Sequence, residues 1–303
     1  MIVQNHRAMA AFAVVVGLMS AVAAAFGVFA RGDGSYEIVT SVRGVTYPMA
    51  TSGVYGYNAQ RVVAEGVGWD VFTLFVAVPT MLAAAAFVAG GSFRGRLLAS
   101  GLFGYFLYQY LEYAMTWAFG PLFPLFVLIF GASLVGLVWF GASVARDGIA
   151  DRFGADFPGR AFAVVSVVMA ILLVVMWTAR IAAGLSGDLE AAGLQGETTL
   201  VVQALDLGLV VPTALLIAAL AWRRTAVGQV LASIYVVTSV SMSAAIVAML
   251  LSAGMVEAAF ELPPILIFGA FLVAMVALAI RMYRPTSRDT YRAPEGGLRW
   301  QPK

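Results

Sequence analysis

The stretch "AFAVV" occurs twice in the chain, at residues 11–15 and again at residues 161–165. Three further short matches follow in the same order within apolar runs: "VPT" at 78–80 and 211–213, "LAS" at 98–100 and 231–233, and "LIFGA" at 128–132 and 266–270. Ordered matches in equivalent runs predict that the second half of the chain repeats the first. The alternative is coincidence in a sequence rich in alanine and valine.

The composition predicts a membrane protein. Hydrophobic residues make up 62% of the 303 residues, charged residues make up 11%, and the mean hydropathy is +0.92. A soluble domain carries about 25% charged residues, so this chain has too little polar surface to face water on all sides. The lipid bilayer is therefore its first expected partner. The basic residues do not form the clustered, aromatic-rich surface of a nucleic-acid-binding protein, and no nucleic acid is expected.

Eight apolar runs are each long enough to cross a bilayer, which takes about 20 residues. They lie at residues 8–30, 69–90, 97–119, 122–145, 161–183, 199–222, 227–251 and 263–282. We therefore predict an all-α, polytopic membrane protein whose eight transmembrane helices form a parallel 4+4 internal duplication. The first run also fits a cleaved signal peptide, but its length and the recurrence of "AFAVV" in the fifth run favour a retained helix.

The placement of arginine sets the predicted orientation and domains. Most of the 18 basic residues lie in segments on the same side as the N-terminus, and basic loops favour the cytoplasmic side. Both termini are therefore expected in the cytoplasm and the chain in the plasma membrane. The use of arginine almost to the exclusion of lysine favours a prokaryotic source. The predicted units are a first four-helix repeat at 1–150 with a long outer loop at 31–68, a second repeat at 151–284, and a polar cytoplasmic tail at 285–303.

Three local signals lie near the outer membrane surface. The stretch "SYEIVTSVRGVTYP" is expected to pair as a β-hairpin, and "YNAQRVVAEGV" is expected to form a short interfacial helix. The side chains of Tyr110, Tyr113 and Trp117 are expected to form an aromatic belt at the interface.

Several kinds of chemistry are excluded by what the sequence lacks. It has no cysteine and a single histidine, His6, so disulfides, thiolate nucleophiles, His-type metal sites and a Ser-His-Asp triad are not expected. A retinal-type Schiff base needs a lysine within a span, but the one lysine is Lys303. The sequence therefore predicts no metal and no cofactor.

Polar residues within the predicted spans are the candidate ligand-binding groups, because ionisable side chains in lipid are costly and tend to face a bundle interior. They are Asp70, Thr73, Tyr105, Tyr108, Glu112, Arg180, Gln203 and Asp206. Asp70 and Thr73 share a helix face, and the 133-residue offset of "VPT" aligns them with Gln203 and Asp206. This pattern predicts one outward-facing polar pocket between the two halves, in which Arg180 neutralises a carboxylate or holds an anion.

Each candidate also has a purely structural interpretation. Asp70 can cap its helix at the interface, and Glu112 and Arg180 lie close enough to the surface to reach water. Asp206 lies about two turns inside its span, where a buried acid needs a hydrogen-bond partner, an ion pair or a proton.

From Gly68 onward the chain resembles a family of bacterial eight-span integral membrane proteins that has no assigned biochemical function. The resemblance rests on "WDVFTLFVAVP" at 69–79, "GSFRGRLL" at 91–98, "GYFLYQYLEYA" at 104–114 and "ALDLGLVVP" at 204–212. It covers about two thirds of the chain. It implies a shared outer-half site that includes Asp70, Thr73, Asp206, Tyr105 and Tyr108. Glu112 and Pro124 depart from the family pattern, which puts a shared role for Glu112 in doubt.

Three functions remain open. The first is a small-solute or proton/cation-coupled transporter that binds its cargo at Asp70 and Asp206, since a helix acid with a perturbed pKa can couple protons. The second is a membrane sensor or assembly subunit whose outer face binds a ligand or a protein partner. The third is a lipid-acting enzyme, which ranks last because the chain offers only carboxylates, serine, threonine and tyrosine as reactive groups.

Overall fold

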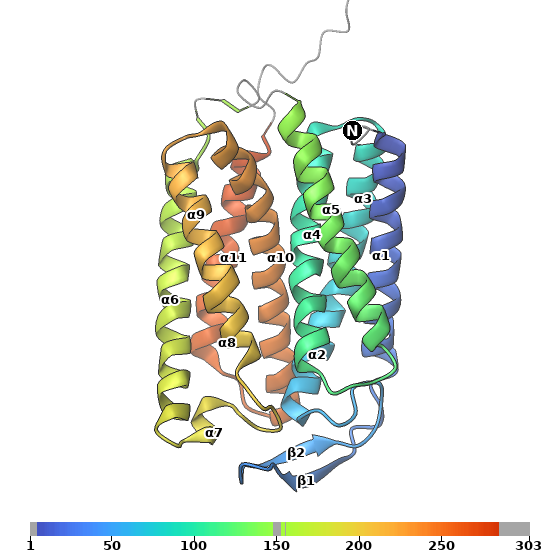
Figure 1. Cartoon of the computed structure of the whole chain (residues 1–303), viewed down its shortest axis with the longest axis vertical. Coiled ribbons are helices and arrows are strands. Elements are labelled where there is room, and N and C mark those ends of the chain that lie inside the picture. The colour runs from blue at the N-terminus through green and yellow to red at the C-terminus, as the bar shows by residue number, and fades with distance from the viewer. Residues whose placement is uncertain (1–4, 148–152, 155, 285–303) are drawn as a thin grey trace, which may run out of the picture.

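The computed structural model describes residues 5–147, 153–154 and 156–284, and the predicted tail at 285–303 lies outside this part. Its longer helices are α1 (His6–Phe29), α2 (Gln60–Phe72), α3 (Val78–Ala89), α4 (Phe93–Thr116), α5 (Phe123–Arg146), α6 (Gly159–Leu185), α9 (Val211–Trp222), α10 (Ala226–Glu257) and α11 (Leu262–Met282). In the described part, seven helical segments are long and apolar enough to cross a membrane. The chain is thus an all-α, polytopic membrane protein, as its composition predicts. The helix α4 is also 24 residues long and lies among the others (Figure 1), but its tyrosines, Gln109 and Glu112 make it more polar.

Two of the membrane-crossing segments contain a short π-helix at the same place. The segment η1 (Thr73–Ala77) joins α2 to α3, and η2 (Asp206–Val210) joins α8 (Val201–Leu205) to α9. Pro79 and Pro212 are the second residues of α3 and α9. Each proline lacks the N–H that would bond the carbonyl four residues earlier, so the local ladder is free to widen into a π-turn.

The helices form two groups that lie side by side (Figure 1). In one group α1 packs on α3 and α4 packs on α5, while in the other α6 packs on α9 and α10 packs on α11. The groups meet where α4 contacts α10, α2 contacts α10 and α8 contacts α4. We call the contact between the two groups the join, and it is formed by α2 and α4 of one group and by α8 and α10 of the other.

The turn before α4 and the turn before α10 have the same construction. Ser92 and Thr225 are the N-caps, and their hydroxyl oxygens accept hydrogen bonds of 3.0 Å from the N–H groups of Gly95 and Gly228. A Cβ on Gly95 would lie 2.7 Å from the Cβ of Phe87, and one on Gly228 would lie against Leu220 and 2.8 Å from the N of Ala221. Glycine is needed at both places because the preceding helix passes too close for a side chain.

One end of the molecule carries the β-hairpin that the sequence predicts (Figure 1). Strand β1 (Tyr36–Thr40) pairs antiparallel with β2 (Thr46–Ala50) in the register Tyr36↔Ala50 to Thr40↔Thr46. The start of α1 and the end of α11 lie at the opposite end of the molecule (Figure 1). The short helix α7 (Leu189–Ala192) lies in the loop of the second group, at the same end as the hairpin.

One expectation for this region is wrong. The stretch "YNAQRVVAEGV" does not form a separate interfacial helix, because α2 begins at Gln60 and continues without a break through η1 into α3. Two glycines of α2 serve close packing and do not end the helix. A Cβ on Gly66 would meet the Trp117 ring, and one on Gly68 would meet the backbone of Ala248 and the side chain of Ser252. The second membrane segment is therefore longer at its N-terminal end than the apolar run indicates.

Candidate functional site

The first cluster of polar residues surrounds Asp70, whose exposed fraction is 0%. Its carboxylate accepts hydrogen bonds from the hydroxyl of Tyr55, from the hydroxyl of Tyr113 at 3.3 Å and from the amide of Gln109 at 3.5 Å. Thr73 extends the cluster, because its hydroxyl donates to Gln109 at 2.9 Å and shares a 2.6 Å hydrogen bond with the hydroxyl of Tyr105. We call these six residues the Asp70 cluster. Neutral groups satisfy its carboxylate.

The Asp70 cluster is closed at the hairpin end of the molecule by the loop after the hairpin. Tyr55 lies in this loop, and its ring centre is 4.0 Å from that of Trp117, which in turn is 4.8 Å from that of Tyr113. Gly27 of α1 permits the closure, since a Cβ there would collide with the Asp70 carboxylate and lie 2.5 Å from the Tyr55 hydroxyl. Burial, reinforced by the Asp70 charge, raises the pKa of Tyr55 well above its usual value. Tyr55 therefore acts as a neutral donor.

The second cluster surrounds Asp206, the first residue of η2. Tyr108 of α4 donates its hydroxyl to one carboxylate oxygen, and Trp177 of α6 donates its indole N–H to the other at 2.8 Å. All three residues are half-buried, so part of this Asp206 cluster lies at the surface of the molecule. It joins the two helix groups, because α4 belongs to one and α6 to the other. Within the described ranges, no arginine forms an ion pair with Asp206.

Further acids lie near Asp206. The Glu112 carboxylate of α4 is close enough for its charge to interact with those of Asp206, Glu65 and Glu197. Glu197 lies in the loop before α8, where burial and the Glu65 charge raise its pKa to about 7. Glu65, Glu112 and Glu197 thus lie close enough to interact through their charges, and Glu112 also interacts with Asp206.

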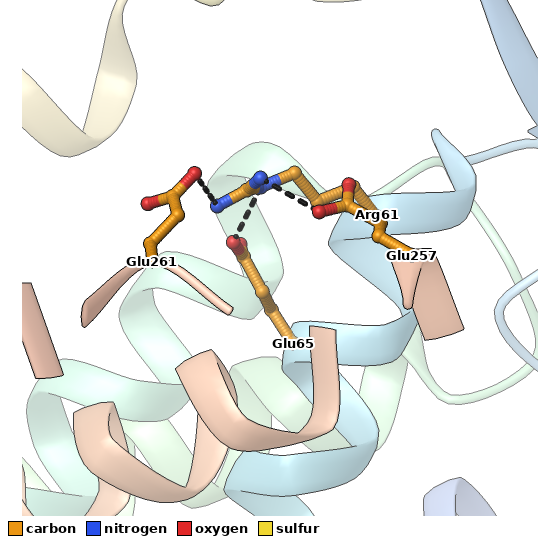
Figure 2. Close-up of polar contacts among 4 residues, drawn as sticks. All are labelled: Arg61, Glu65, Glu257 and Glu261. Carbon is orange, nitrogen blue, oxygen red and sulfur yellow. Dashed lines mark hydrogen bonds and ion pairs between the residues drawn. The ribbon is translucent and has the colours of Figure 1, made fainter. Parts of the chain in front are cut away.

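Figure 2 shows Arg61, a base that is bound to several of the acids at the hairpin end. The guanidinium of Arg61 contacts Glu65 at 3.0 Å, Glu257 at 3.0 Å and Glu261 at 2.9 Å. Arg61 and Glu65 come from α2, Glu257 ends α10, and Glu261 directly precedes α11. Three carboxylates share one guanidinium, so the group keeps an excess of negative charge. The ion pairs also tie the first helix group to the second.

The predicted single pocket is thus two clusters in the structure. Asp70, Thr73 and Tyr105 come together in one cluster, while Tyr108 and Asp206 come together in the other. Arg180 contacts neither carboxylate. Its guanidinium lies 5.3 Å from the centre of the Trp177 ring, on an exposed part of α6. Gln203 is buried on α8.

Sequence reasoning assigns no binding role to several residues of these clusters. Tyr113 is predicted to be part of an aromatic belt, but it is buried and bonded to Asp70. Gln109 carries a signal, because it shares the helix face of Tyr105 and Glu112. Trp177 lies one turn before Arg180 on α6. For Tyr55 there is no signal in the sequence, because it reaches Asp70 only through the path of its loop.

Comparisons with protein-family models, curated proteins and solved structures find no match to this chain. The resemblance to the bacterial eight-span family therefore stays a prediction, and the functional argument depends on the site itself.

Proposed function

We propose that this chain is a duplicated, eight-helix carrier of the bacterial plasma membrane that binds a proton or a small organic cation at Asp206. The observation that carries the proposal is the setting of Asp206: a half-buried carboxylate at the join of two helix groups, held by a tyrosine and a tryptophan. Neutral donors orient the carboxylate without cancelling its charge. A negative charge in a low-dielectric setting binds a cation or a proton far more strongly than it would in water.

The shared geometry of the two helix groups supports the duplication and an eighth span. The π-helices start at Thr73 and Asp206, the N-caps are Ser92 and Thr225, and the close-packed glycines are Gly95 and Gly228. Every one of these pairs is separated by the 133 residues that separate the two copies of "VPT". On this alignment α4 corresponds to α10, which is one of the membrane-crossing helices. Halves with four spans each share one orientation, and parallel repeats of this kind build transporters with a site between the halves.

The charges around Asp206 support a cationic cargo over an anionic one. Glu112 interacts through its charge with Asp206, Glu65 and Glu197, and Arg61 is already shared among three carboxylates. Excess negative charge near a site raises the local concentration of cations and repels anions. With the hairpin end outside, as arginine placement predicts, these acids lie toward the cell exterior.

Site-directed labelling tests whether water reaches Asp206. The chain has no native cysteine, so Asp206→Cys, Thr73→Cys and Glu37→Cys can each be treated with a membrane-impermeant maleimide on intact cells. We expect labelling at position 206 and at the exposed hairpin position 37. We expect none at position 73, which aligns with 206 in the repeat and lies in the buried Asp70 cluster. Failure of 206 to react while 37 reacts would contradict the open site.

Proton flux into proteoliposomes tests the function. A potassium gradient with valinomycin drives protons inward, and an internal pH dye reports their entry. We expect flux with the wild-type chain, its loss in Asp206→Asn, and its retention in Glu37→Gln, a matched change of an exposed acid on β1. If no protons enter, the same vesicles are assayed with radiolabelled tetraethylammonium. Flux of neither cation, or flux of either that Asp206→Asn leaves unchanged, would overturn the proposal.

A further inference from the structure

A separate cavity lies at the outer end of the molecule, between the loop after α1, the start of α2 and the end of α10. Its volume is about 330 Å³, which lies at the lower end of the range of about 300–1,000 Å³ typical of small-molecule sites. Neither Asp206 nor Asp70 lines it. The lining side chains that matter here are those of Arg31, Asp33, Ser52, Gln60, Val63 and Val256.

The polar wall of this cavity is held in place by a tight contact between two turns. Gly32 and Gly53 have φ of +84° and +83°, and a Cβ on either would collide with the other turn. The Ser52 hydroxyl crosses this contact and donates a 2.6 Å hydrogen bond to one oxygen of Asp33, which also accepts a bond of 3.0 Å from the N–H of Ser35. The carboxylate of Asp33 is therefore fixed before any ligand arrives.

The wall carries one charge of each sign. The hydrogen bonds from Ser52 and Ser35 hold the pKa of Asp33 below its usual range, so this group is ionised at every physiological pH. Both hydrogen bonds end on the same carboxylate oxygen, which leaves the other for a ligand. Within the described ranges, no ion pair or hydrogen bond occupies the guanidinium of Arg31.

The opposite wall is apolar. Val63 and Val67 lie one turn apart on α2, and Val256 faces the cavity from the end of α10. Gln60, at the first position of α2, adds an amide between the charged and the apolar walls. A ligand that fits this lining needs two opposite charges close together and a short apolar group beyond them.

We propose that the cavity binds a small zwitterion of amino-acid size. Its ammonium contacts the free oxygen of Asp33, its acid group lies toward Arg31 and Gln60, and its aliphatic side chain packs on Val63, Val67 and Val256. The site goes beyond the carrier function, since it shares no residue with the Asp206 cluster. It gives the outer face a binding site for a free amino acid.

The test measures calorimetric binding of L-leucine to the full chain in lipid nanodiscs. Isoamylamine and isocaproate, which are leucine without its carboxylate and without its ammonium, are the matched probes. We expect leucine to bind at least about tenfold more tightly than either, because hydrogen bonds to charged groups contribute that much. Asp33→Asn is expected to weaken leucine binding by about tenfold or more, and Glu37→Gln to leave it unchanged.

Two further variants make the result decisive. Val256→Trp fills the cavity from an exposed position and is expected to abolish leucine binding without affecting the turn that holds Asp33. Asp206→Asn is expected to bind leucine like the wild type, so that failure of the carrier function and failure of this site are distinguishable. No saturable leucine binding to the folded wild type, binding that survives Val256→Trp, or equally tight binding of isoamylamine would overturn the proposal.

Discussion

Asp70 lies three residues before the π-helix η1 and Asp206 is the first residue of the π-helix η2, and the structure treats the two acids in opposite ways. Asp70 has three neutral donors and no exposed surface, whereas Asp206 has two donors and is only half-buried. The difference begins on the neighbouring helix. Counted from the two copies of "AFAVV", Gly27 of α1 and Trp177 of α6 occupy the same position. Glycine leaves room for Tyr55 to cover Asp70, while tryptophan fills that room and binds Asp206 itself.

These settings favour a structural role for Asp70 and leave Asp206 available to bind a ligand. A carboxylate enclosed by matched donors fixes the fold around it, because removing any partner leaves a buried polar group unsatisfied. The carboxylate of Asp206 is not enclosed in this way, because it has two donors and keeps part of its surface exposed at the join of the two helix groups.

The largest expected effect follows from removing the enclosed acid. Asp70→Ala leaves the hydroxyls of Tyr55 and Tyr113 and the amide of Gln109 without their common acceptor, so we expect a loss of about 3 kcal/mol of stability. Asp206→Ala is the matched control, with an expected loss below about 1 kcal/mol because water replaces the carboxylate. Thermal unfolding of the purified proteins in detergent measures both. Equal losses would break the distinction between the two acids.

The second effect tests the role of Gly27. Gly27→Ala places a methyl group against the Asp70 carboxylate and the Tyr55 hydroxyl, and overpacking of this kind costs about 2 kcal/mol. Gly131→Ala is the control, because a Cβ on this α5 glycine meets nothing within 4 Å. It is expected to stabilise the chain slightly through helix propensity. If Gly27→Ala were as stable as Gly131→Ala, the closure of Asp70 would not depend on the glycine.

Much of the architecture is predictable because it depends on local patterns. Apolar runs of span length predict the membrane helices, and the alternation and turn residues around Gly44 predict the hairpin. Helical spacing also places Asp70 beside Thr73. The closure of Asp70 and the sharing of Arg61 with Glu257 are different, because they join segments far apart in the chain. The start of α2 is hidden from the sequence for a related reason. Arg61 and Glu65 interrupt the apolar run, and two of the carboxylates that pair with Arg61, those of Glu257 and Glu261, lie far away in the chain.

The third effect is a pH dependence of stability, which we expect from Glu197, an acid near the Asp206 cluster. The folded chain holds the pKa of Glu197 at about 7, above the usual value of 4.5. Between these values the unfolded chain has released its proton while the folded chain keeps it, so a rise in pH destabilises the fold.

Glu197→Gln removes that penalty. We expect the variant to be more stable than the wild type by about 1–2 kcal/mol above neutral pH, after allowance for solvent screening, and equal to it in acid. Unfolding midpoints at about pH 4 and about pH 8 measure the difference. Glu190→Gln, a change of an exposed acid on α7, is the control. A constant difference across the pH range would contradict the assignment.

The smallest expected effect comes from Trp177, and it tests whether this side chain makes the setting of Asp206 different from that of Asp70. Trp177→Phe keeps most of the ring but removes the N–H that donates to Asp206, and the loss of one such hydrogen bond costs about 1 kcal/mol or less. If Trp177 only fills space, the variant will match the wild type in unfolding and in proton flux. If Trp177 orients the carboxylate, proton flux will fall while the stability changes little. Orientation affects the binding of the cargo, but the packing of the fold stays intact. Tyr108→Phe removes the donor on the other oxygen and should act in the same direction. A pair of variants that lower stability but leave flux unchanged would place Asp206 with Asp70 as a structural acid, and the carrier proposal would lose its site.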